Sequence, residues 1–290
     1  MVGRTLSHHL KHGKLTFLGK PLYNSLIAME LGYVRWKDRN KYFGPTSLVD
    51  EKLTAIVKTF ERPETVTRLL ESIKRFYPNM RVIVVDDSRE PLELEGVKRI
   101  VLPYDSGVSA GRQAALEAVE TSYVLLLDDD FVFYGETDLE PAMRAMEANE
   151  AIDIMGGTVV NLPSFKSADY RKAGLHPTSG ESVLPEGALL GGFPVYDKVA
   201  NFYIARTQRL KLVGWDARIK RLDHADFFSR AKGVLRTVYN EGFKVLHAQT
   251  PFNKVYMEKR RDVAMDRLVI MAKYYKKREL KRFFGLLKIL

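Results

Sequence analysis

Three consecutive aspartates, Asp128, Asp129 and Asp130, follow the apolar run at residues 124–127. Adjacent carboxylates repel one another, and holding them at the end of a buried strand raises their desolvation cost unless positive charge is close. A divalent cation is a natural partner, because Mg²⁺ and Mn²⁺ take hard oxygen ligands, often one or two carboxylates with substrate phosphates. We therefore predict that Asp128 and Asp130 hold a metal ion that bridges a diphosphate. The alternative is a solvated acidic turn.

Two more acids, Asp86 and Asp87, end another apolar run. A carboxylate there can accept hydrogen bonds from a base N–H or from ribose hydroxyls, and a simple turn or helix cap is the alternative. Residues 106–112 (SGVSAGR) form a small-residue turn that opens a helical pattern. The backbone of this turn can approach an anion closely beside Gly111, and the Arg112 guanidinium can donate two hydrogen bonds to it. This turn is therefore a candidate phosphate contact.

His247 also stands at a predicted strand end, after residues 243–246. The chain has no cysteine, so imidazole is the obvious nitrogen ligand to join Asp128 and Asp130 on the metal. A histidine that only packs in the core is the alternative.

Residues 222–228 (LDHADFF) offer a general base. A carboxylate or imidazole flanked by apolar residues can be tuned towards neutral pH. On a helix His224 and Asp226 lie about 200° apart around the axis, so one of them faces the reacting centre. We favour Asp226 as the base, with His224 next. The alternative is that Asp223 and Asp226 form a helix-capping pair.

The elements that position these residues follow from the hydrophobic pattern. Short, nearly continuous apolar runs predict strands buried on both faces. They occupy residues 53–59, 81–85, 97–102 and 122–127. Helical spacing of apolar residues lies between them at 64–76 and 110–119. Strands that alternate with helices predict an α/β fold, a Rossmann-like, mostly parallel sheet flanked by helices, in which ligands bind at the carboxyl ends of the strands.

Later segments are less regular. Residues 161–198 are rich in Gly, Pro and Ser, which is typical of a functional loop, and we assign them to the acceptor side. Strands are expected at 201–206 and 243–247, and a helix at 223–232. The predicted organisation is a basic N-terminal extension packing on the core (1–50), a central domain (51–250) with a nucleotide-binding half (51–160) and an acceptor-binding half (161–250), and a basic helical C-terminal tail (251–290).

Composition and charge narrow the function. The chain has 290 residues, 46% hydrophobic and 28% charged, which suits a folded globular protein. Its net charge of +10 is concentrated at the ends: residues 1–50 hold 8 Lys/Arg against 3 Asp/Glu, and residues 251–290 hold 12 against 4. The middle is mildly acidic, which argues against nucleic-acid binding. The basic tail at 274–287 either lies on an anionic membrane or packs on protein.

The combined motifs resemble GT-A glycosyltransferases of the family 2 type, and most closely the β-1,4-N-acetylgalactosaminyltransferases of ganglioside synthesis. The resemblance extends from about residue 53 to about residue 250. The motifs that carry it are KTFERP (58–63), FYP (76–78), VDDS (85–88), AGR (110–112), YVLLLDDDFV (123–132), NFYIART (201–207), VGWD (213–216) and HA (247–248).

The resemblance implies a UDP-sugar donor, with Asp86 or Asp87 near the uracil and Asp128 and Asp130 on Mn²⁺ or Mg²⁺. It also implies inversion at the anomeric carbon, with the base in the segment that contains His224 and Asp226. The family carries a histidine and an acid at those two positions but no acid at position 223. The predicted nucleotide-binding residues are Lys58, Thr59, Arg62, Asp86, Asp87, Gly111, Arg112, Asp128 and Asp129.

We therefore expect an inverting, metal-dependent glycosyltransferase that moves GalNAc, GlcNAc or Gal from a UDP-sugar to a glycan or glycolipid hydroxyl. The Golgi enzymes of this type have a membrane anchor and cysteines that this sequence lacks, so we expect a cytoplasmic enzyme of bacterial surface polysaccharide synthesis, peripheral on the inner face of the membrane if the tail binds lipid. The alternatives are a nucleotidyltransferase that makes nucleotide sugars and a non-catalytic nucleotide-sugar-binding protein.

Overall fold

The computed structural model describes residues 16–275 except residues 168, 170, 172, 173 and 179. The helices are α2 (Thr16–Lys37), α3 (Ser47–Lys52), α4 (Pro63–Phe76), α5 (Val108–Glu117), α6 (Glu140–Ala148), α7 (Thr207–Lys211), α8 (Asp223–Ala231), α9 (Lys254–Arg261) and α10 (Ala264–Tyr274). The strands are β1 (Leu53–Thr59), β2 (Arg81–Asp86), β3 (Lys98–Val101), β4 (Tyr123–Asp128), β5 (Phe131–Val132), β6 (Ile154–Asn161), β7 (Lys166–Ser167), β8 (Leu189–Leu190), β9 (Phe193–Pro194), β10 (Tyr203–Arg206) and β11 (Thr237–His247).

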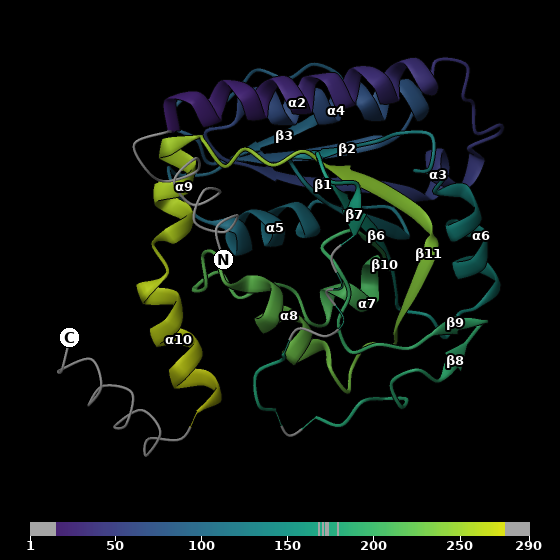
Figure 1. Cartoon of the computed structure of the whole chain (residues 1–290). Coiled ribbons are helices and arrows are strands. Elements are labelled where there is room, and N and C mark those ends of the chain that lie inside the picture. Colours follow the sequence, from purple (N-terminus) through teal and green to yellow (C-terminus); the bar gives the residue numbers. More distant parts are fainter. Residues whose placement is uncertain (1–15, 168, 170, 172–173, 179, 276–290) are drawn as a thin grey trace, which may run out of the picture.

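A curled sheet at the centre of the molecule orders the fold (Figure 1). Its strand order is β3-β2-β1-β4-β10-β6-β11-β5, with β7 paired to β6. Six of these nine described strands run in one direction, and β10, β5 and β7 run against them. The predicted α/β fold with a mostly parallel sheet is therefore confirmed.

The predicted elements between residues 53 and 128 agree with the structure to within two residues at each end. Strands β1, β2 and β4 are buried over almost their whole length, which accounts for their continuous apolar sequence. Pro63 opens α4, where a missing backbone N–H leaves no helical hydrogen bond unmade.

Helices cover both faces of the sheet. On one face α3, α4 and α6 pack in one cluster with the sheet, through side chains such as Val49, Leu69 and Met143. On the other face α5, α7 and α8 pack in a second cluster that includes Leu116, Leu210 and Phe227. Burial on both sides fixes the direction of the central strands and hence the place where their carboxyl ends meet.

The two ends of the described chain add helices outside these layers (Figure 1). The inner face of α2 packs Ile27, Leu31 and Val34 against a cluster near β5 and the end of β11. The described part of the predicted helical tail (251–290) forms two helices, α9 and α10, because the chain leaves the helical conformation at Asp262. Residues 276–290 of that tail lie outside the described residues. Among residues 16–275 as described, no helix is both long and apolar enough to cross a membrane.

Close packing at Gly157 generates the first prediction. A Cβ atom there would lie 2.7 Å from ring atoms of both Phe202 and Phe243, which are buried in the core. We expect Gly157→Ala to lower the free energy of unfolding by about 1–3 kcal/mol because neither ring has room to move. Urea denaturation measures the change. Gly32→Ala in α2 is the control, since its Cβ meets nothing within 4 Å and alanine favours a helix; equal losses in both variants would contradict the packing argument.

Candidate active site

The carboxyl ends of β1, β2 and β4 meet at one edge of the sheet. Thr59 on β1 is in register with Asp86 on β2, and Lys58 is in register with Asp128 on β4. A cavity of about 320 Å³ opens there, which we call the strand-end pocket. It is lined by Lys58, Phe60, Arg62, Asp105, Gly107, Val108, Arg112, Asp128, Asp129, Asp130, Asn201, Arg221, Asp223, His224, His247, Gln249, Tyr256, Lys259 and Arg260.

Arg62 joins two of the three consecutive aspartates. Its Nη1 donates to Asp130 Oδ2 at 2.9 Å and its Nη2 donates to Asp129, and all three side chains are buried. Burial raises the pKa of Asp129 to about 6, although Arg62 opposes that rise. Burial also acts to raise the pKa of Asp130, but Arg62 and His247 outweigh it and hold that pKa well below its usual range. Arg62 thus stabilises the charged form of Asp130, whereas burial dominates at Asp129.

Arg112 on α5 joins the third aspartate to a distant helix. Its Nη2 donates to Asp128 Oδ1 at 2.5 Å, and its Nη1 donates to Asp223 at the start of α8. Burial raises the pKa of Asp223, and Arg112 opposes the rise. Asp223 and Asp128, which are 95 residues apart in sequence, therefore face one cation in one pocket.

His247 is oriented for contact with Asp130. Its Nδ1 lies 2.8 Å from Asn161 Oδ1, an acceptor, so Nδ1 carries a proton in this arrangement. Its Nε2 lies 3.2 Å from Asp130 Oδ1. Burial acts to lower the pKa of His247, but Asp130 outweighs it and raises that pKa. An outer hydrogen bond that fixes the tautomer and points Nε2 inward is typical of metal-binding histidines.

The side chains around Asp130 agree only in part with the predicted metal site. Asp130 Oδ1 and His247 Nε2 are separated by 3.2 Å, close to the roughly 3 Å between neighbouring ligands of an octahedral divalent cation with bonds of about 2.1 Å. Asp128 lines the same pocket but its Oδ1 is bound by Arg112. Among the described residues no group of three or more His, Asp or Glu side chains is clustered tightly enough to hold a metal ion. Asp130 and His247 fit a metal that also takes substrate ligands, whereas the predicted three-residue cluster with Asp128 is not formed.

Several predicted nucleotide contacts are instead held within the protein. Lys58 Nζ lies 2.5 Å from Asp87 Oδ1, and the Gly107 N–H donates to Asp87 Oδ2 at 2.8 Å. A Cβ on Gly111 would lie 2.4 Å from Lys58 Cγ, so glycine there leaves room for the lysine chain. Burial lowers the pKa of Lys58, and Asp87 opposes this. Lys58 thus lines the pocket while Asp87 holds its ammonium and Gly111 leaves room for its chain; we call these three residues the positioning group.

Asp86 and Thr59 follow the same pattern. Asp86 accepts backbone hydrogen bonds from Ser88 and Leu92 at 2.9 and 3.1 Å, so it shapes the turn after β2. The Thr59 hydroxyl donates to Asp129 Oδ2 at 2.8 Å. Thr59 and Asp86 also line a second cavity, of about 360 Å³, beside the strand-end pocket. Thr59 and Asp129 therefore form a hydrogen bond with each other, which the sequence alone did not indicate.

The structure corrects the preferred base, Asp226. Its Oδ1 accepts from Lys273 Nζ and Tyr274 Oη at 2.7 Å each, and its Oδ2 accepts from Arg230 Nε at 2.9 Å. It does not line the strand-end pocket. Burial acts to raise the pKa of Asp226, but Lys273, Tyr274 and Arg230 outweigh it and lower that pKa. Asp226 therefore ties α10 to α8 and lies outside the strand-end pocket.

Asp223 and His224 do line the pocket. The N-cap of α8 is Leu222, without a side-chain capping bond, so the capping interpretation of Asp223 and Asp226 is wrong. Burial and the nearby Lys198 lower the pKa of His224 to about 3, so this imidazole is neutral near pH 7. Its Nε2 lies 2.7 Å from the Val199 carbonyl, which assigns the proton to Nε2.

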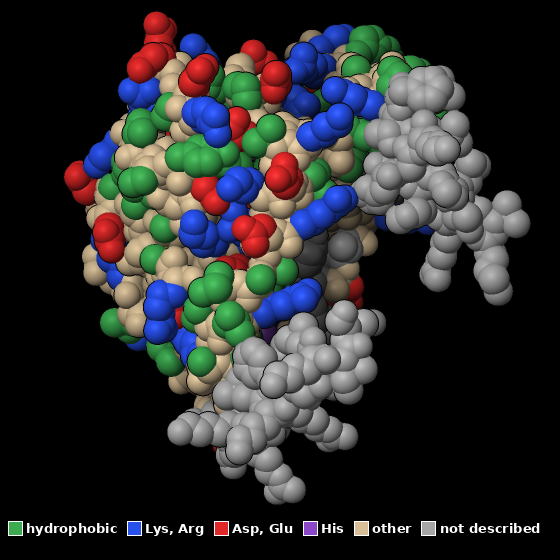
Figure 2. All heavy atoms as spheres, turned by 90° about the vertical axis from the view of Figure 1, so that its left-hand side faces the viewer, with side chains coloured by type: hydrophobic (Ala, Val, Ile, Leu, Met, Phe, Trp, Pro, Cys, Tyr) green, Lys and Arg blue, Asp and Glu red, His purple; other side chains and the backbone are tan. Residues whose placement is uncertain are grey.

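Helix α9 supplies a wall of the pocket that the sequence analysis missed. Tyr256 lies against the Arg62 guanidinium, with 3.6 Å from Cζ to the ring centroid. Asn253 caps α9 and also donates to the Glu61 carbonyl at 2.9 Å. Lys259 Nζ lies 3.3 Å from Asp105 Oδ2. Figure 2 views the side of the molecule on which α9 and α10 lie and shows many Lys and Arg side chains there. Asn253, a residue type that often caps helices, was the sequence feature that could have indicated the start of α9.

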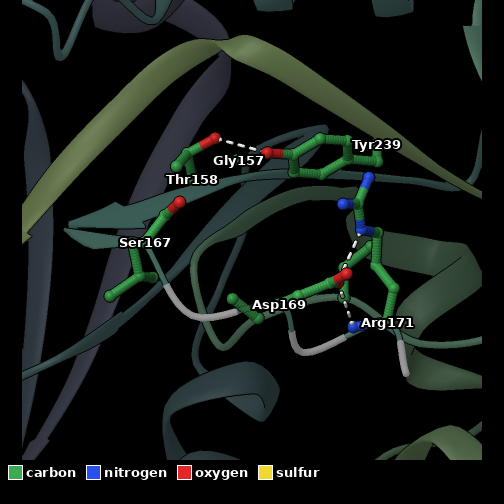
Figure 3. A pocket seen from close by; sticks show the side chains of 9 residues that line it. Gly157, Thr158, Ser167, Asp169, Arg171 and Tyr239 are labelled. Atoms are coloured by element: carbon green, nitrogen blue, oxygen red, sulfur yellow. Dashed lines mark hydrogen bonds and ion pairs between the residues drawn. The ribbon is translucent and has the colours of Figure 1, made fainter. Parts of the chain in front are cut away.

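A smaller cavity is lined in part by the segment expected to face the acceptor, through Ser167, Asp169 and Arg171 (Figure 3). Its volume is about 70 Å³, and its lining includes Gly157, Thr158 and Val199. The hydroxyls of Thr158 and Tyr239 are 2.7 Å apart, and the Arg171 guanidinium faces the Tyr239 ring at 4.4 Å from its centroid. Val199 connects this cavity to the strand-end pocket, because its carbonyl contacts His224.

Comparisons with known proteins agree with this geometry. Residues 54–182 match the family described as glycosyl transferase family 2. Beta-1,4 N-acetylgalactosaminyltransferase 2 of Mus musculus is 37% identical over 201 residues, which cover 66% of this chain and 38% of that protein. Beta-1,4 N-acetylgalactosaminyltransferase 1 of Homo sapiens is 36% identical over 195 residues, 63% of this chain and 36% of that protein. The chain thus spans about two fifths of the length of these relatives, and the predicted resemblance is confirmed.

Solved structures share the fold. Staphylococcus aureus TarS 1-349 in complex with UDP matches with a TM-score of 0.52 at 20% identity, covering 75% of this chain and 65% of that chain. The same fragment in complex with UDP-GlcNAc matches with a TM-score of 0.52 at 19% identity, covering 69% and 59%. The predicted GT-A type of fold is confirmed by this likeness.

The Asp226 cluster generates the second prediction. We expect Asp226→Asn to lower the free energy of unfolding by about 2 kcal/mol near pH 7, because charged donors lose their buried acceptor. The folded-state pKa is below the unfolded value of about 3.9, so this contribution is present above pH 4 and is lost as the pH falls through the lowered pKa. Urea denaturation between pH 7 and pH 3 measures it. Asp262→Asn, at an exposed position, is the control. A gap between wild type and Asp226→Asn that widens towards acid pH would contradict the cluster.

Proposed function

We propose that the chain, whose residues 54–182 match glycosyl transferase family 2, transfers a sugar from a UDP-sugar to a glycan or glycolipid hydroxyl with inversion at the anomeric carbon. The observation that carries the proposal is the strand-end pocket, where Asp130 and Asp223 line one cavity together with Arg62 and Arg112. A diphosphate needs cationic partners and an attacking hydroxyl needs a base, and this pocket contains both. The UDP and UDP-GlcNAc complexes of TarS support UDP as the nucleotide.

The donor diphosphate has cationic partners from several elements. Arg62 lies before α4 and Arg112 lies on α5, while Lys259 and Arg260 reach the same pocket from α9. Guanidinium groups donate two parallel hydrogen bonds to phosphate oxygens, which fixes orientation as well as charge. The positioning group of Lys58, Asp87 and Gly111 supports the floor on which the nucleotide rests.

Asp130 and His247 are the residues that we propose hold Mn²⁺ or Mg²⁺, with Asp128 beside them. A metal ion held there would supply Lewis-acid chemistry, neutralising charge on the departing UDP. Asn161 holds the His247 ring, and Arg62 holds Asp130 ionised, so both donors are oriented before a ligand arrives.

Asp223 is our proposed base. The acceptor oxygen forms the new bond to the anomeric carbon, the bond from that carbon to the diphosphate oxygen breaks, and the acceptor proton passes to the Asp223 carboxylate. Burial raises the pKa of Asp223, which makes it a stronger base than an ordinary aspartate. His224 is the second candidate because it lines the same pocket, but its pKa of about 3 makes it a weak base.

The third prediction concerns the donor and the metal. UDP release from a panel of UDP-sugars with Mn²⁺ should be donor-selective and should stop when EDTA is added. Asp130→Asn and His247→Gln should each lower turnover by about 10²-fold or more, the effect of removing a preorganised electrostatic group. Asp262→Asn is the control, and thermal unfolding of each variant separates misfolding from lost chemistry. Metal-independent release that survives Asp130→Asn would contradict the metal assignment, and no release from any donor would contradict the function.

The fourth prediction concerns the base. Asp223→Asn should lower kcat by about 10²–10⁴-fold, the usual contribution of a positioned base, while UDP affinity stays near that of the wild type. Steady-state kinetics and UDP titration calorimetry measure the two quantities. Asp226→Asn, assayed below its unfolding temperature, is the matched control and should keep its kcat. The reverse pattern would return the base to Asp226.

A further inference from the structure

Helix α2 carries large apolar side chains on the face that points away from the protein. The exposed fractions are 59% for Leu22, 38% for Leu26, 69% for Met29, 55% for Tyr33 and 61% for Trp36. These residues recur at spacings of four, three, four and three, so they form one stripe along the helix. We call this stripe the outer face of α2.

The opposite face of α2 is already used. Ile27, Leu31 and Val34 are 6–8% exposed and pack in the cluster beside β5 and the end of β11. The helix is therefore apolar on two sides, although in Figure 1 it lies at the edge of the molecule, outside the layers that cover the sheet. A surface helix normally presents one apolar stripe to the core and a polar side to water, so a second stripe indicates a further partner.

The charges on α2 favour an anionic partner. Lys20, Arg35 and Lys37 are basic, and Glu30 is the one acid in the helix. At 100° per residue, Lys20 and Arg35 lie about 140–160° from the centre of the outer face, whereas Lys37 lies about 60° from it. Lys37 and Arg39, whose guanidinium lies over the Trp36 ring, therefore flank the outer face against the one acid, Glu30, and an anionic lipid surface complements them.

The aromatic residues of α2 also favour a membrane as the partner. Tyr33 and Trp36 lie next to each other near the end of α2, with ring centroids 6.2 Å apart. The Arg39 guanidinium lies 5.0 Å from the Trp36 ring centroid. Aromatic rings beside basic side chains are typical of helices that lie in the headgroup region of a bilayer.

We propose that the outer face of α2 lies in the interface of an anionic membrane, with its helix axis parallel to the surface. Leu22, Leu26 and Met29 enter the acyl boundary, and Lys37 and Arg39 meet the headgroups. A groove of about 1360 Å³ runs between α2 and α9, with Arg35, Arg68 and Arg62 in its lining. The proposal does not depend on the basic tail or on the catalytic assignment.

Trp36 provides a direct test in the full chain. The chain has two tryptophans, and Trp215 is 6% exposed whereas Trp36 is 61% exposed. On adding vesicles of phosphatidylcholine and phosphatidylglycerol, the emission should shift to the blue and be quenched by lipids brominated on the acyl chain. Trp36→Phe should abolish the shift, while co-flotation with the vesicles persists.

Substitutions on the stripe test the surface itself. Leu26→Ser with Met29→Ser should lower co-flotation with anionic vesicles by at least about tenfold. Leu189→Ser with Leu212→Ser is the matched control, because these leucines are 72% and 63% exposed elsewhere, and it should bind as the wild type does. Circular dichroism melting checks that each variant folds.

Three outcomes would overturn the proposal. The first is an unchanged Trp36 spectrum with anionic vesicles. The second is equal binding to pure phosphatidylcholine vesicles, which would remove the role of charge. The third is a dimer in sedimentation velocity that becomes a monomer in the Leu26→Ser, Met29→Ser variant, which would make the outer face of α2 a contact between copies of the chain.

Discussion

The neutralisation of buried carboxylates at the ends of β1, β2 and β4 is the interaction on which the rest of the site depends. Lys58 pairs with Asp87, Arg62 with Asp129 and Asp130, and Arg112 with Asp128 and Asp223. An unpaired charge at such depth is strongly destabilising, so each acid requires the element that carries its cation. Arg62 lies at the start of α4 and Arg112 lies on α5, so the fold and the charge pattern of the pocket form together.

The same constraint prepares the site for its ligand. The acids face cations inside a partly enclosed cavity, where charge interactions are stronger than in water. The guanidinium groups of Arg62 and Arg112 are already held in place by Asp128, Asp129 and Asp130, so under the proposed function little reorganisation would be needed when a diphosphate binds. Helix α9 closes one side of this arrangement by placing Tyr256 over Arg62.

Much of the fold was predictable because its signals are local. Continuous apolar runs identify β1, β2 and β4, and the acids that follow them identify the edge of the sheet where a ligand binds. The base was not predictable in the same way. On a helix, His224 and Asp226 point in different directions, but the sequence does not say which direction faces the pocket. Two of the side chains that donate to Asp226, those of Lys273 and Tyr274, lie 47 and 48 residues further along the chain. The α9 wall depends on similar long-range packing.

The most direct test of the account is the anomeric configuration of the sugar released when water replaces the acceptor. One displacement on an α-linked UDP-sugar, with Asp223 as the base, places the attacking oxygen on the face opposite the diphosphate. Proton NMR of a UDP-sugar incubated with the protein, recorded before mutarotation reaches equilibrium, should show the β-anomer first and more slowly with Asp223→Asn. The α-anomer appearing first would contradict a single displacement in this pocket.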